Sequence, residues 1–367
     1  MPKSTNQTVL FIIPSLTFGG VEKFALEYAS SLKKRGFNPV VIGLGKNGPL
    51  APLLFERGIE HEAFELRFYS GQSKRSFFAN TFKFYQKTAK WHAEVWVGAS
   101  YWCNIVVGLV GPWRRVEKRI WSQRSVDTGI FKGRMERMAQ RGITHYSANG
   151  LAPLKHIVER HGLAAPDVHV LTNVLEKELF FCSPKEVISQ PKTCFRVLMA
   201  ANYFPEKLQS MAIEAVRQVR DVRPDIPLRL DLLGTAPGGN SVEQNKALAF
   251  DLDLSRCVFF HTNNQEKVRL FQQADIGLLA TLSEGYSNSI VEYMAYGLPV
   301  LASDILANRD VLGDEFPAAF FLNTKLALAN AIIALNDNPD LQLAMGQSNQ
   351  IRARARHIFD PAQQWPF

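Results

Sequence analysis

Two glutamates stand eight residues apart in the segment SEGYSNSIVEYMAYGLPV, which runs from Ser283 to Val300. Glu284 precedes a cluster of small polar residues, and Glu292 follows it inside a helical pattern. An ionised carboxylate accepts hydrogen bonds, and the vicinal hydroxyls of a sugar are paired donors. Because the first glutamate lies in the loop before the helix, the two side chains do not share one helical face. We therefore expect them to bind two different groups.

The residues between the glutamates suit a phosphate. A helix start presents free backbone N–H groups and the positive end of the helix dipole. Gly285 lets the backbone approach a ligand closely, and hydrogen-bonding side chains follow at Ser287, Asn288 and Ser289. This pattern predicts that one glutamate binds the ribose of a nucleotide and the other a transferred sugar, with a diphosphate between them.

A structural interpretation of the same residues stays open. Ser289-Ile-Val-Glu292 fits the S-x-x-E capping box, in which Glu292 only satisfies a backbone N–H at the helix start. Glu284, a loop residue, is by itself expected to be solvated. These residues alone are compatible with helix capping and with ligand binding.

Alternating strands and helices are expected to position this segment. The chain opens with a continuous apolar run over 9–13, which is typical of a strand buried on both faces. Gly19 and Gly20 lie in the loop that follows it, and a helical pattern runs from Val21 to Arg35. Further strands are expected at 39–42, 95–97, 119–121 and 169–171, with a helix at 151–160.

The second half repeats the alternation. Strands are expected at 196–200, 228–233, 258–260, 276–280 and 299–302, and helices at 209–220, 266–273 and 289–296. This order predicts an α/β fold with parallel sheets covered on both faces. Glu284 then follows the carboxyl end of a strand, where open parallel sheets bind ligands. We expect two Rossmann-like parallel-sheet domains that face each other across a cleft.

The length of 367 residues exceeds the roughly 250–300 residues at which a single core usually stops growing. We expect a first domain over 1–180, a second over 181–355, and a final segment, 356–367, that returns to the first. The stretch from Cys182 to Thr193 contains two prolines and no sustained periodicity, so it is interpreted as the interdomain linker.

Composition narrows the setting. The four cysteines include no C-x-x-C pair, and the first dozen residues contain neither a charged leader nor an apolar signal run, which favours a reducing cytoplasm. No run approaches the roughly 20 apolar residues of a membrane span. The net charge of +8 indicates a polyanionic neighbour, which could be nucleic acid, an anionic bilayer or a phosphorylated substrate.

Four stretches in order resemble one protein family. They are FIIPSLTFGGVEKFALEYASSLKKRGFNPVVI, VLTNVLEKELF, QQADIGLLATLSEG and SEGYSNSIVEYMAYGLPVLASD. The last resembles the E-x7-E signature of the retaining family-four glycosyltransferases, which have the GT-B architecture. The resemblance implies a retaining enzyme that moves a sugar from a nucleotide diphosphate sugar, such as a UDP- or GDP-sugar, to a glycan or polyprenyl-linked acceptor. Cell-surface polysaccharide or lipopolysaccharide synthesis is the implied setting, at the inner face of the cytoplasmic membrane and without a cofactor.

The same resemblance assigns roles to residues. It implies that Glu292 binds the donor ribose and that Glu284 lies near the transferred sugar. Backbone groups from Tyr286 to Ser289 would hold the diphosphate, and Gly19-Gly20 would approach the donor or acceptor from the first domain.

Two departures from the family pattern are visible. Relatives carry a Gly-Arg pair followed by Lys and Gly after the first strand of the second domain, whereas this chain retains Lys207 but has Asn202 in place of Arg and Leu208 in place of Gly. Asn supplies a neutral hydrogen bond where Arg supplies a fixed cation. The alternative function is therefore a protein that binds a nucleotide sugar or glycolipid with little transfer.

The second departure is in the first domain, where many relatives carry His after a strand. Here the residues are Gln123 and Arg124, which are interpreted either as acceptor or donor contacts or as structural surface residues.

A metal site is not expected. Asp251-Leu-Asp253 matches a D-x-D pattern, but it follows a helical run and is interpreted as a helix end. The eight histidines show no H-x-x-H or H-E-x-x-H spacing.

The stretch from Phe64 to Trp91 is basic and aromatic, with Glu65 as its single acid. A helix over 77–91 would present aromatics on more than one side with lysines between them. This composition suits an anionic bilayer interface, and a core helix with a solvated basic face explains it equally well. Single-stranded nucleic acid ranks last, because the chain contains no recognisable RNA-binding module.

Overall fold

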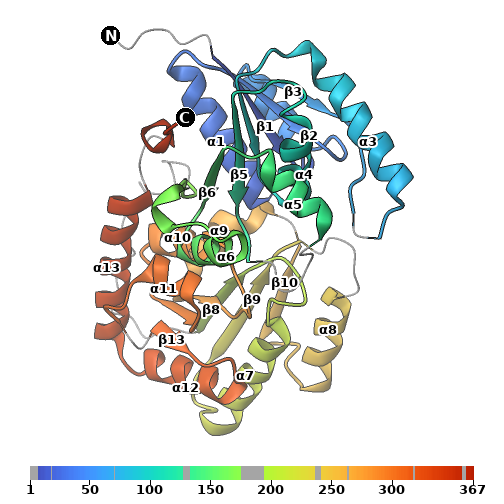
Figure 1. The fold of residues 1–367 in the computed structure, drawn as a ribbon. Helices are drawn as coiled ribbons and strands as arrows, with labels where there is room; N and C mark the ends of the chain where they lie inside the picture. The colour runs from blue at the N-terminus through green and yellow to red at the C-terminus, as the bar shows by residue number, and fades with distance from the viewer. Residues whose placement is uncertain are drawn as a thin grey trace. The chain divides into compact units, whose positions relative to one another are not determined.

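The structure is a computed structural model of the chain, and it describes residues 7–17, 19–69, 71–126, 133–174, 194–235, 241–262, 264–316, 319–357 and 361–367. The chain forms two compact units (Figure 1). Unit 1 comprises Met1–Val174 with Phe359–Phe367, and unit 2 comprises Leu175–Ile358. The linker expected between Cys182 and Thr193 lies outside the described residues.

Unit 1 contains a parallel sheet of seven strands in the order β3-β2-β1-β4-β5-β6-β7. The strands are β1 (Thr8–Ile13), β2 (Asn38–Gly43), β3 (Glu60–Ala63), β4 (Val95–Gly98), β5 (Lys118–Gln123), β6 (His145–Ala148) and β7 (Val168–Val170). The helices are α1 (Gly20–Lys34), α2 (Leu50–Glu56), α3 (Lys74–Lys87), α4 (Tyr101–Val110), α5 (Arg134–Arg141) and α6 (Leu151–His161). On one side of β1 lie β2 and β3, and on its other side lie β4 to β7. Chain order therefore reverses between β1 and β4.

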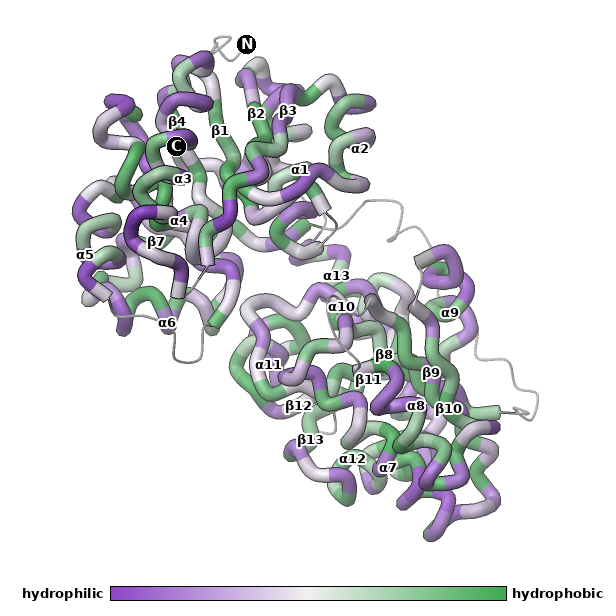
Figure 2. The backbone as a smooth tube through the Cα atoms, turned by 90° about the vertical axis from the view of Figure 1, so that its right-hand side faces the viewer, coloured by the Kyte–Doolittle hydropathy of each residue, from purple (hydrophilic) through white to green (hydrophobic). Residues whose placement is uncertain are grey.

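Strand β1 is buried on both faces, as its continuous apolar sequence predicts. Phe11 and its alternate neighbours pack in one cluster with α1, whereas Leu10 and Ile12 pack in a second cluster with α4. Figure 2 shows β1 in green, the hydrophobic end of the hydropathy scale. Helices therefore cover both faces of the sheet, which is what a parallel sheet requires.

The last residues of the chain pack within unit 1. The side-chain oxygen of Gln364 accepts hydrogen bonds from the backbone N–H of Thr172 and from the Tyr28 hydroxyl, both at 3.1 Å. Trp365 lies 5.8 Å from Phe11 between ring centroids. These contacts attach the final segment to α1 and to the residues that follow β7.

Unit 2 contains a parallel sheet of six strands in the order β10-β9-β8-β11-β12-β13. The strands are β8 (Phe195–Ala200), β9 (Leu228–Leu233), β10 (Val258–His261), β11 (Ile276–Leu279), β12 (Val300–Ser303) and β13 (Phe320–Phe321). The helices are α7 (Gln209–Val222), α8 (Ser241–Asp251), α9 (Lys267–Gln273), α10 (Asn288–Ala295), α11 (Leu306–Leu312), α12 (Lys325–Asn336) and α13 (Pro339–His357).

One tyrosine fixes α10 on this sheet. The Tyr293 hydroxyl accepts a hydrogen bond from the Ala200 N–H at 2.6 Å and donates to the Leu278 carbonyl at 3.1 Å. Gly277 of β11 makes room for its ring, since a Cβ at that position would lie 2.3 Å from the ring. Helix α10 is thereby attached to both β8 and β11, the strands that precede the loops bearing Lys207 and Glu284.

The predicted α/β class with two Rossmann-like parallel-sheet domains is confirmed. Asp251 ends α8, in agreement with the helix-end interpretation of the D-x-D match. Among the described residues, no helix combines the length and the apolar character that crossing a membrane requires.

Candidate functional site

The candidate site lies where chain order reverses in unit 2, between β8 and β11. Ligands of open parallel sheets bind beyond the carboxyl ends of the strands at such a switch point. The loops that follow these strands contact each other directly: Lys207 and Thr281 form an isolated antiparallel bridge, and the Leu282 N–H donates to the Glu206 carbonyl at 2.9 Å. Residues about 75 positions apart in sequence therefore meet at one edge of the sheet.

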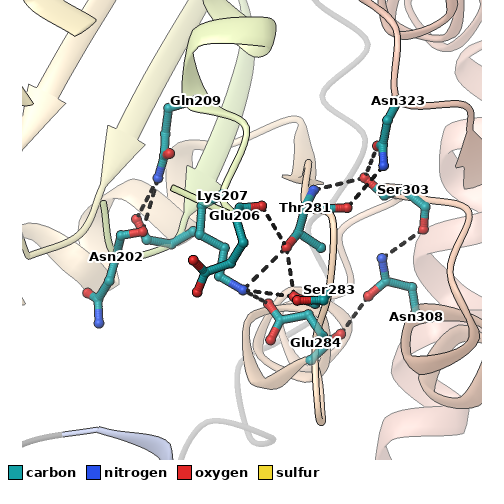
Figure 3. Close-up of polar contacts among 12 residues, drawn as sticks. Asn202, Glu206, Lys207, Gln209, Thr281, Ser283, Glu284, Ser303, Asn308 and Asn323 are labelled. Carbon is teal, nitrogen blue, oxygen red and sulfur yellow. Dashed lines mark hydrogen bonds and ion pairs between the residues drawn. The ribbon is translucent and has the colours of Figure 1, made fainter. Parts of the chain in front are cut away.

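Lys207 and Glu284 form an ion pair at this edge, with 2.6 Å between Nζ and Oε1 (Figure 3). The ammonium also donates to the Thr281 hydroxyl at 3.3 Å and to the Ser283 carbonyl at 3.4 Å. An ammonium has three hydrogens to donate, so these three acceptors fix its position. Burial raises the pKa of Glu284, and the charge of Lys207 opposes that rise.

The loop between β11 and α10, residues 280–287, is called the signature loop below. Polar side chains from β12, from α11 and from the residues after β13 support it. The Ser303 hydroxyl accepts the Thr281 N–H at 2.8 Å and donates to Asn323 at 2.5 Å. Asn308 accepts from the Ser287 hydroxyl at 2.5 Å and donates to the Ser303 carbonyl at 2.8 Å. Sequence analysis did not identify these residues, although polar side chains after the expected strand at 299–302 were a usable signal.

The start of α10 decides the capping question. The helix begins at Asn288 with Ser287 as its N-cap, so Ser289 is the second helical residue and the predicted capping box of Ser289 and Glu292 is wrong. The Glu292 carboxylate, only 5% exposed, instead accepts a hydrogen bond from Lys267 Nζ at 2.7 Å. The side chain of Glu292 is thus held by a cation from another helix.

Sequence analysis did not identify Lys267. A chain of ion pairs holds the helical turn that precedes it. The preceding residue, Glu266, pairs with His261 at 2.8 Å, and His261 pairs through its other ring nitrogen with Asp231 at 2.8 Å. Asp231 in turn accepts a bidentate ion pair from Arg229. This chain of contacts fixes the turn at the carboxyl end of β10, from which Lys267 reaches Glu292.

Asn202, which stands where the family has Arg, lies apart from the ion pair. Its side-chain oxygen accepts hydrogen bonds from the N–H and the hydroxyl of Thr235, both at 2.9 Å. Figure 3 shows this side chain pointing away from the Lys207 amine. Asn202 therefore links the loop after β8 to the loop after β9. Leu208, which replaces the family's second Gly, caps α7 and packs against the unit 2 core.

The remaining residues of the signature loop divide between side-chain and backbone roles. The Tyr286 hydroxyl hydrogen-bonds His357 Nδ1 of α13 at 2.9 Å, and burial lowers the pKa of His357 to about 4. The Asn288 N–H donates to the Tyr286 carbonyl at 3.0 Å. Gly285 lies between Glu284 and this turn. The Ser289 N–H lies in the first turn of α10, where a helix has no internal acceptors for its N–H groups.

In unit 1, Gly19 caps α1 and Gly20 is its first residue. A Cβ at Gly19 would lie 2.6 Å from Glu22 Oε2. Gln123 is the last residue of β5 and Arg124 follows it. Both side chains are buried, so the surface interpretation is wrong. Gln123 accepts from the Trp121 indole at 3.0 Å and donates to the Ser125 carbonyl at 2.7 Å.

The Arg124 guanidinium lies 3.6 Å from the centroid of the Phe24 ring and donates a hydrogen bond to the Asn173 side chain. Both residues therefore have structural partners inside unit 1.

Sequence comparison matches a family model to residues of unit 2. Residues 185–352 match the family model of the glycosyl transferases group 1. The D-inositol 3-phosphate glycosyltransferase of Pseudarthrobacter chlorophenolicus is 28% identical over 170 residues, which are 44% of this chain and 39% of that protein. The protein of the same name from Corynebacterium jeikeium is 32% identical over 95 residues, 25% of this chain and 23% of its own length. The matched region thus spans about two fifths or less of these relatives.

Structure comparison extends over both units. Anabaena HepE in complex with UDP-glucose matches with a TM-score of 0.81 at 19% identity, covering 97% of this chain and 96% of that one. The lipopolysaccharide outer core galactosyltransferase WaaB matches with a TM-score of 0.71 at 16% identity, covering 98% of each chain. At these identities the likeness shows the fold.

Proposed function

Residues 185–352 of this chain belong to the glycosyl transferases group 1 family, and from that premise we propose that the protein is a retaining glycosyltransferase. It moves a sugar from a nucleotide diphosphate sugar to a hydroxyl of a glycan or lipid-linked acceptor in cell-surface polysaccharide or lipopolysaccharide synthesis. The Lys207–Glu284 pair at the switch point of unit 2 is the observation that carries this proposal.

The chemistry follows from the charges of these residues. When the glycosidic bond of the donor breaks, negative charge accumulates on the leaving diphosphate. Lys207 neutralises that charge from a fixed position, which is the type of interaction that lowers a barrier most. Glu284 accepts hydrogen bonds from the transferred sugar. The acceptor oxygen bonds to the anomeric carbon on the face from which the diphosphate leaves, and the acceptor's hydroxyl proton passes to the departing phosphate oxygen, so no protein nucleophile is required.

Donor binding is assigned to α10 and its loop. Glu292, oriented by Lys267, accepts hydrogen bonds from the ribose hydroxyls. Backbone N–H groups from Gly285 to Ser289 bind the diphosphate, because a helix start favours anions. Within unit 1, Gly19 and Gly20 at the start of α1 let the backbone approach a donor or acceptor closely. Lys207 supplies the neutralising cation, so the reaction proceeds without a metal ion or other cofactor.

A screen of nucleotide sugars tests the donor. Thermal shifts of the full chain with UDP-, GDP-, ADP- and CMP-sugars would identify the nucleotide, and UDP-sugars are the first choice because HepE binds UDP-glucose. Nucleotide diphosphate release is then measured with neutral glycosides and polyprenyl-linked sugars as acceptors. Release that exceeds that of Glu284→Ala supports transfer, and release equal to that variant contradicts it.

A binding protein with little transfer activity is the second candidate, favoured by Asn202 in place of a cation. If it is correct, Asn202→Arg raises nucleotide release from near zero. The hydrogen bonds of Asn202 to Thr235 favour a structural role instead, so we expect the variant to lower stability without raising activity. Rapid turnover by the wild-type chain would exclude the binding protein.

Helix α3 has an exposed basic and aromatic face that bears on the class of acceptor. Phe77 and Phe84 of this helix are buried, whereas Phe78 and Phe82 are 67% and 57% exposed on the next stripe. Arg75 flanks them on the same exposed face. One face of α3 is therefore core and the other is basic and aromatic, and the bilayer contact stays a prediction.

We propose that this face contacts an anionic membrane, at the inner surface of the cytoplasmic membrane where lipid-linked acceptors would reside. Each basic residue near such a surface contributes about 1 kcal/mol, and exposed aromatics partition into the interface. Lys87 and Lys90 pair with Glu62, so Lys74, Arg75 and Lys83 supply the charge. Nucleic acid is not proposed as a partner.

Vesicle co-flotation tests the membrane contact. The chain should float with phosphatidylglycerol-containing vesicles and not with pure phosphatidylcholine, and salt should weaken binding. Phe78→Ser with Phe82→Ser should abolish flotation, whereas Phe250→Ser, which changes a 75% exposed side chain of α8, should not. Equal flotation of the double variant and the wild type contradicts the proposal.

A further inference from the structure

Unit 1 has a switch point of its own, between β1 and β4, where chain order reverses in its sheet. The corresponding place in unit 2 holds the Lys207–Glu284 pair. In unit 1 the helices that begin there are α1, which follows β1, and α4, which follows β4. Because ligands of parallel sheets bind at such points, the side chains in the first turns of these helices are candidates for a second site.

Glu22 lies in this position. It is the third residue of α1 and is 7% exposed. Its carboxylate lies against Gly19, where a Cβ would approach Oε2 to 2.6 Å. It is also near Cys103 in the first turn of α4: burial raises the pKa of the Cys103 thiol to about 12, and the charge of Glu22 acts in the same direction. The carboxylate therefore lies at the start of α1, close enough to the start of α4 to act electrostatically on Cys103.

Within the described ranges, the carboxylate of Glu22 has no cationic partner. Among the residues that the structure describes, it forms neither an ion pair nor a hydrogen bond to another side chain, and only its own backbone N–H donates to it. Burial accordingly raises the pKa of Glu22.

Every other buried carboxylate in the described part of the chain has a partner from another residue. Glu136 pairs with Arg160, Asp231 with Arg229 and Glu292 with Lys267, and Asp275 accepts the Arg196 N–H at 2.8 Å. Neither oxygen of Glu22 is among the fully buried side-chain atoms without a partner in the described residues, so the carboxylate of this 7% exposed side chain reaches solvent. A carboxylate that reaches solvent and has no partner from another described residue is available to a ligand with hydrogen-bond donors.

We propose that Glu22 accepts a hydrogen bond from a hydroxyl of the acceptor sugar, and that it makes this subsite selective for neutral sugars over phosphorylated ones. A hydroxyl donates to a carboxylate, whereas a phosphate lacks a donor and is repelled by the charge. The inference rests on the proposed function and specifies its acceptor, since it assigns a neutral hydroxyl-bearing sugar to unit 1.

Calorimetric titration of the full chain tests the site with defined probes. The probes are the methyl glycosides of glucose, galactose and mannose, together with glucose 6-phosphate as the anionic counterpart. At least one neutral glycoside should bind, at least tenfold more tightly to the wild type than to Glu22→Ala. Glucose 6-phosphate should bind the wild type more weakly than methyl glucoside, and Glu22→Gln should reduce that discrimination.

Matched controls make the result specific. Glu27→Gln removes a charge from the same helix at a position paired with Arg57, so it should leave glycoside binding unchanged. Each variant is checked by its melting temperature, and Glu22→Gln is expected to fold because it removes a buried charge. Failure of every neutral glycoside to bind, or equal binding by the wild type and Glu22→Ala, overturns the proposal. Binding of UDP in parallel separates this outcome from failure of the donor site.

Discussion

Removing Lys267 tests whether Glu292 depends on a cation from α9. Lys267→Met keeps the length of the side chain and leaves a carboxylate that is 5% exposed without its ion pair at 2.7 Å. Breaking a fully buried pair in this way costs about 3–5 kcal/mol. Because 27% of the Lys267 side chain is exposed, water compensates part of the loss and we expect about 1–3 kcal/mol.

The measurement is a double-mutant cycle by thermal and denaturant unfolding. For a domain of this size each kcal/mol lowers the melting temperature by about 2–4 °C, so Lys267→Met should melt roughly 2–12 °C lower. Glu292→Gln removes the buried charge and leaves a lysine that reaches solvent, so it should cost less. The double variant should then be more stable than Lys267→Met alone.

Binding of the donor nucleotide separates stability from function. Both single variants should weaken UDP binding, because Glu292→Gln loses the ionised acceptor and Lys267→Met loses its orientation. An unchanged melting temperature for Lys267→Met would refute the ion pair, and unchanged UDP binding by Glu292→Gln would refute ribose recognition.

Three further outcomes are expected. Tyr293→Phe leaves the Ala200 N–H without its acceptor at 2.6 Å and should destabilise unit 2 by about 1–3 kcal/mol, whereas Tyr69→Phe, at a 54% exposed site, should be neutral in the same unfolding assay. His357 has a pKa of about 4 in the folded chain against 6.5 in the unfolded chain. The folded chain therefore loses about 3 kcal/mol of its free energy of unfolding as the pH falls from 6.5 toward 4, and this loss is absent above pH 6.5. His357→Gln should show a correspondingly flatter pH profile of unfolding. EDTA should leave nucleotide release unchanged, because Lys207 supplies the positive charge, and loss of activity that Mg²⁺ restores would contradict this.

Local sequence patterns were sufficient for the fold and for part of the site. Continuous apolar runs such as 9–13 identified the buried strands, since a strand covered on both faces has no polar alternation. The position of Glu284 after a strand identified the edge of the sheet that bears the site. Lys207 was found only through its family resemblance, because a contact between loops about 75 residues apart leaves no local pattern.

The misses have physical causes as well. The capping-box interpretation was wrong because α10 begins at Asn288, one residue before the serine of the S-x-x-E pattern. The N-cap is Ser287, whose hydroxyl donates to Asn308. Lys267 and Glu22 occupy first-turn positions where charged residues are common, so sequence does not distinguish a solvated side chain from a buried one. Burial and partners, which depend on the whole sheet, identify both.

Nucleotide diphosphate release by Lys207→Met tests the central claim most directly. Its matched control is Lys325→Met, which removes a 51% exposed lysine from a weak ion pair with Glu214 at 3.8 Å. Loss of one preorganised group that stabilises transition-state charge costs about 2.7–4 kcal/mol, or a factor of roughly 10²–10³ in turnover. We predict that loss for Lys207→Met and turnover within twofold of the wild type for Lys325→Met. Turnover by Lys207→Met within tenfold of the wild type would contradict the assignment of sugar transfer to the Lys207–Glu284 site.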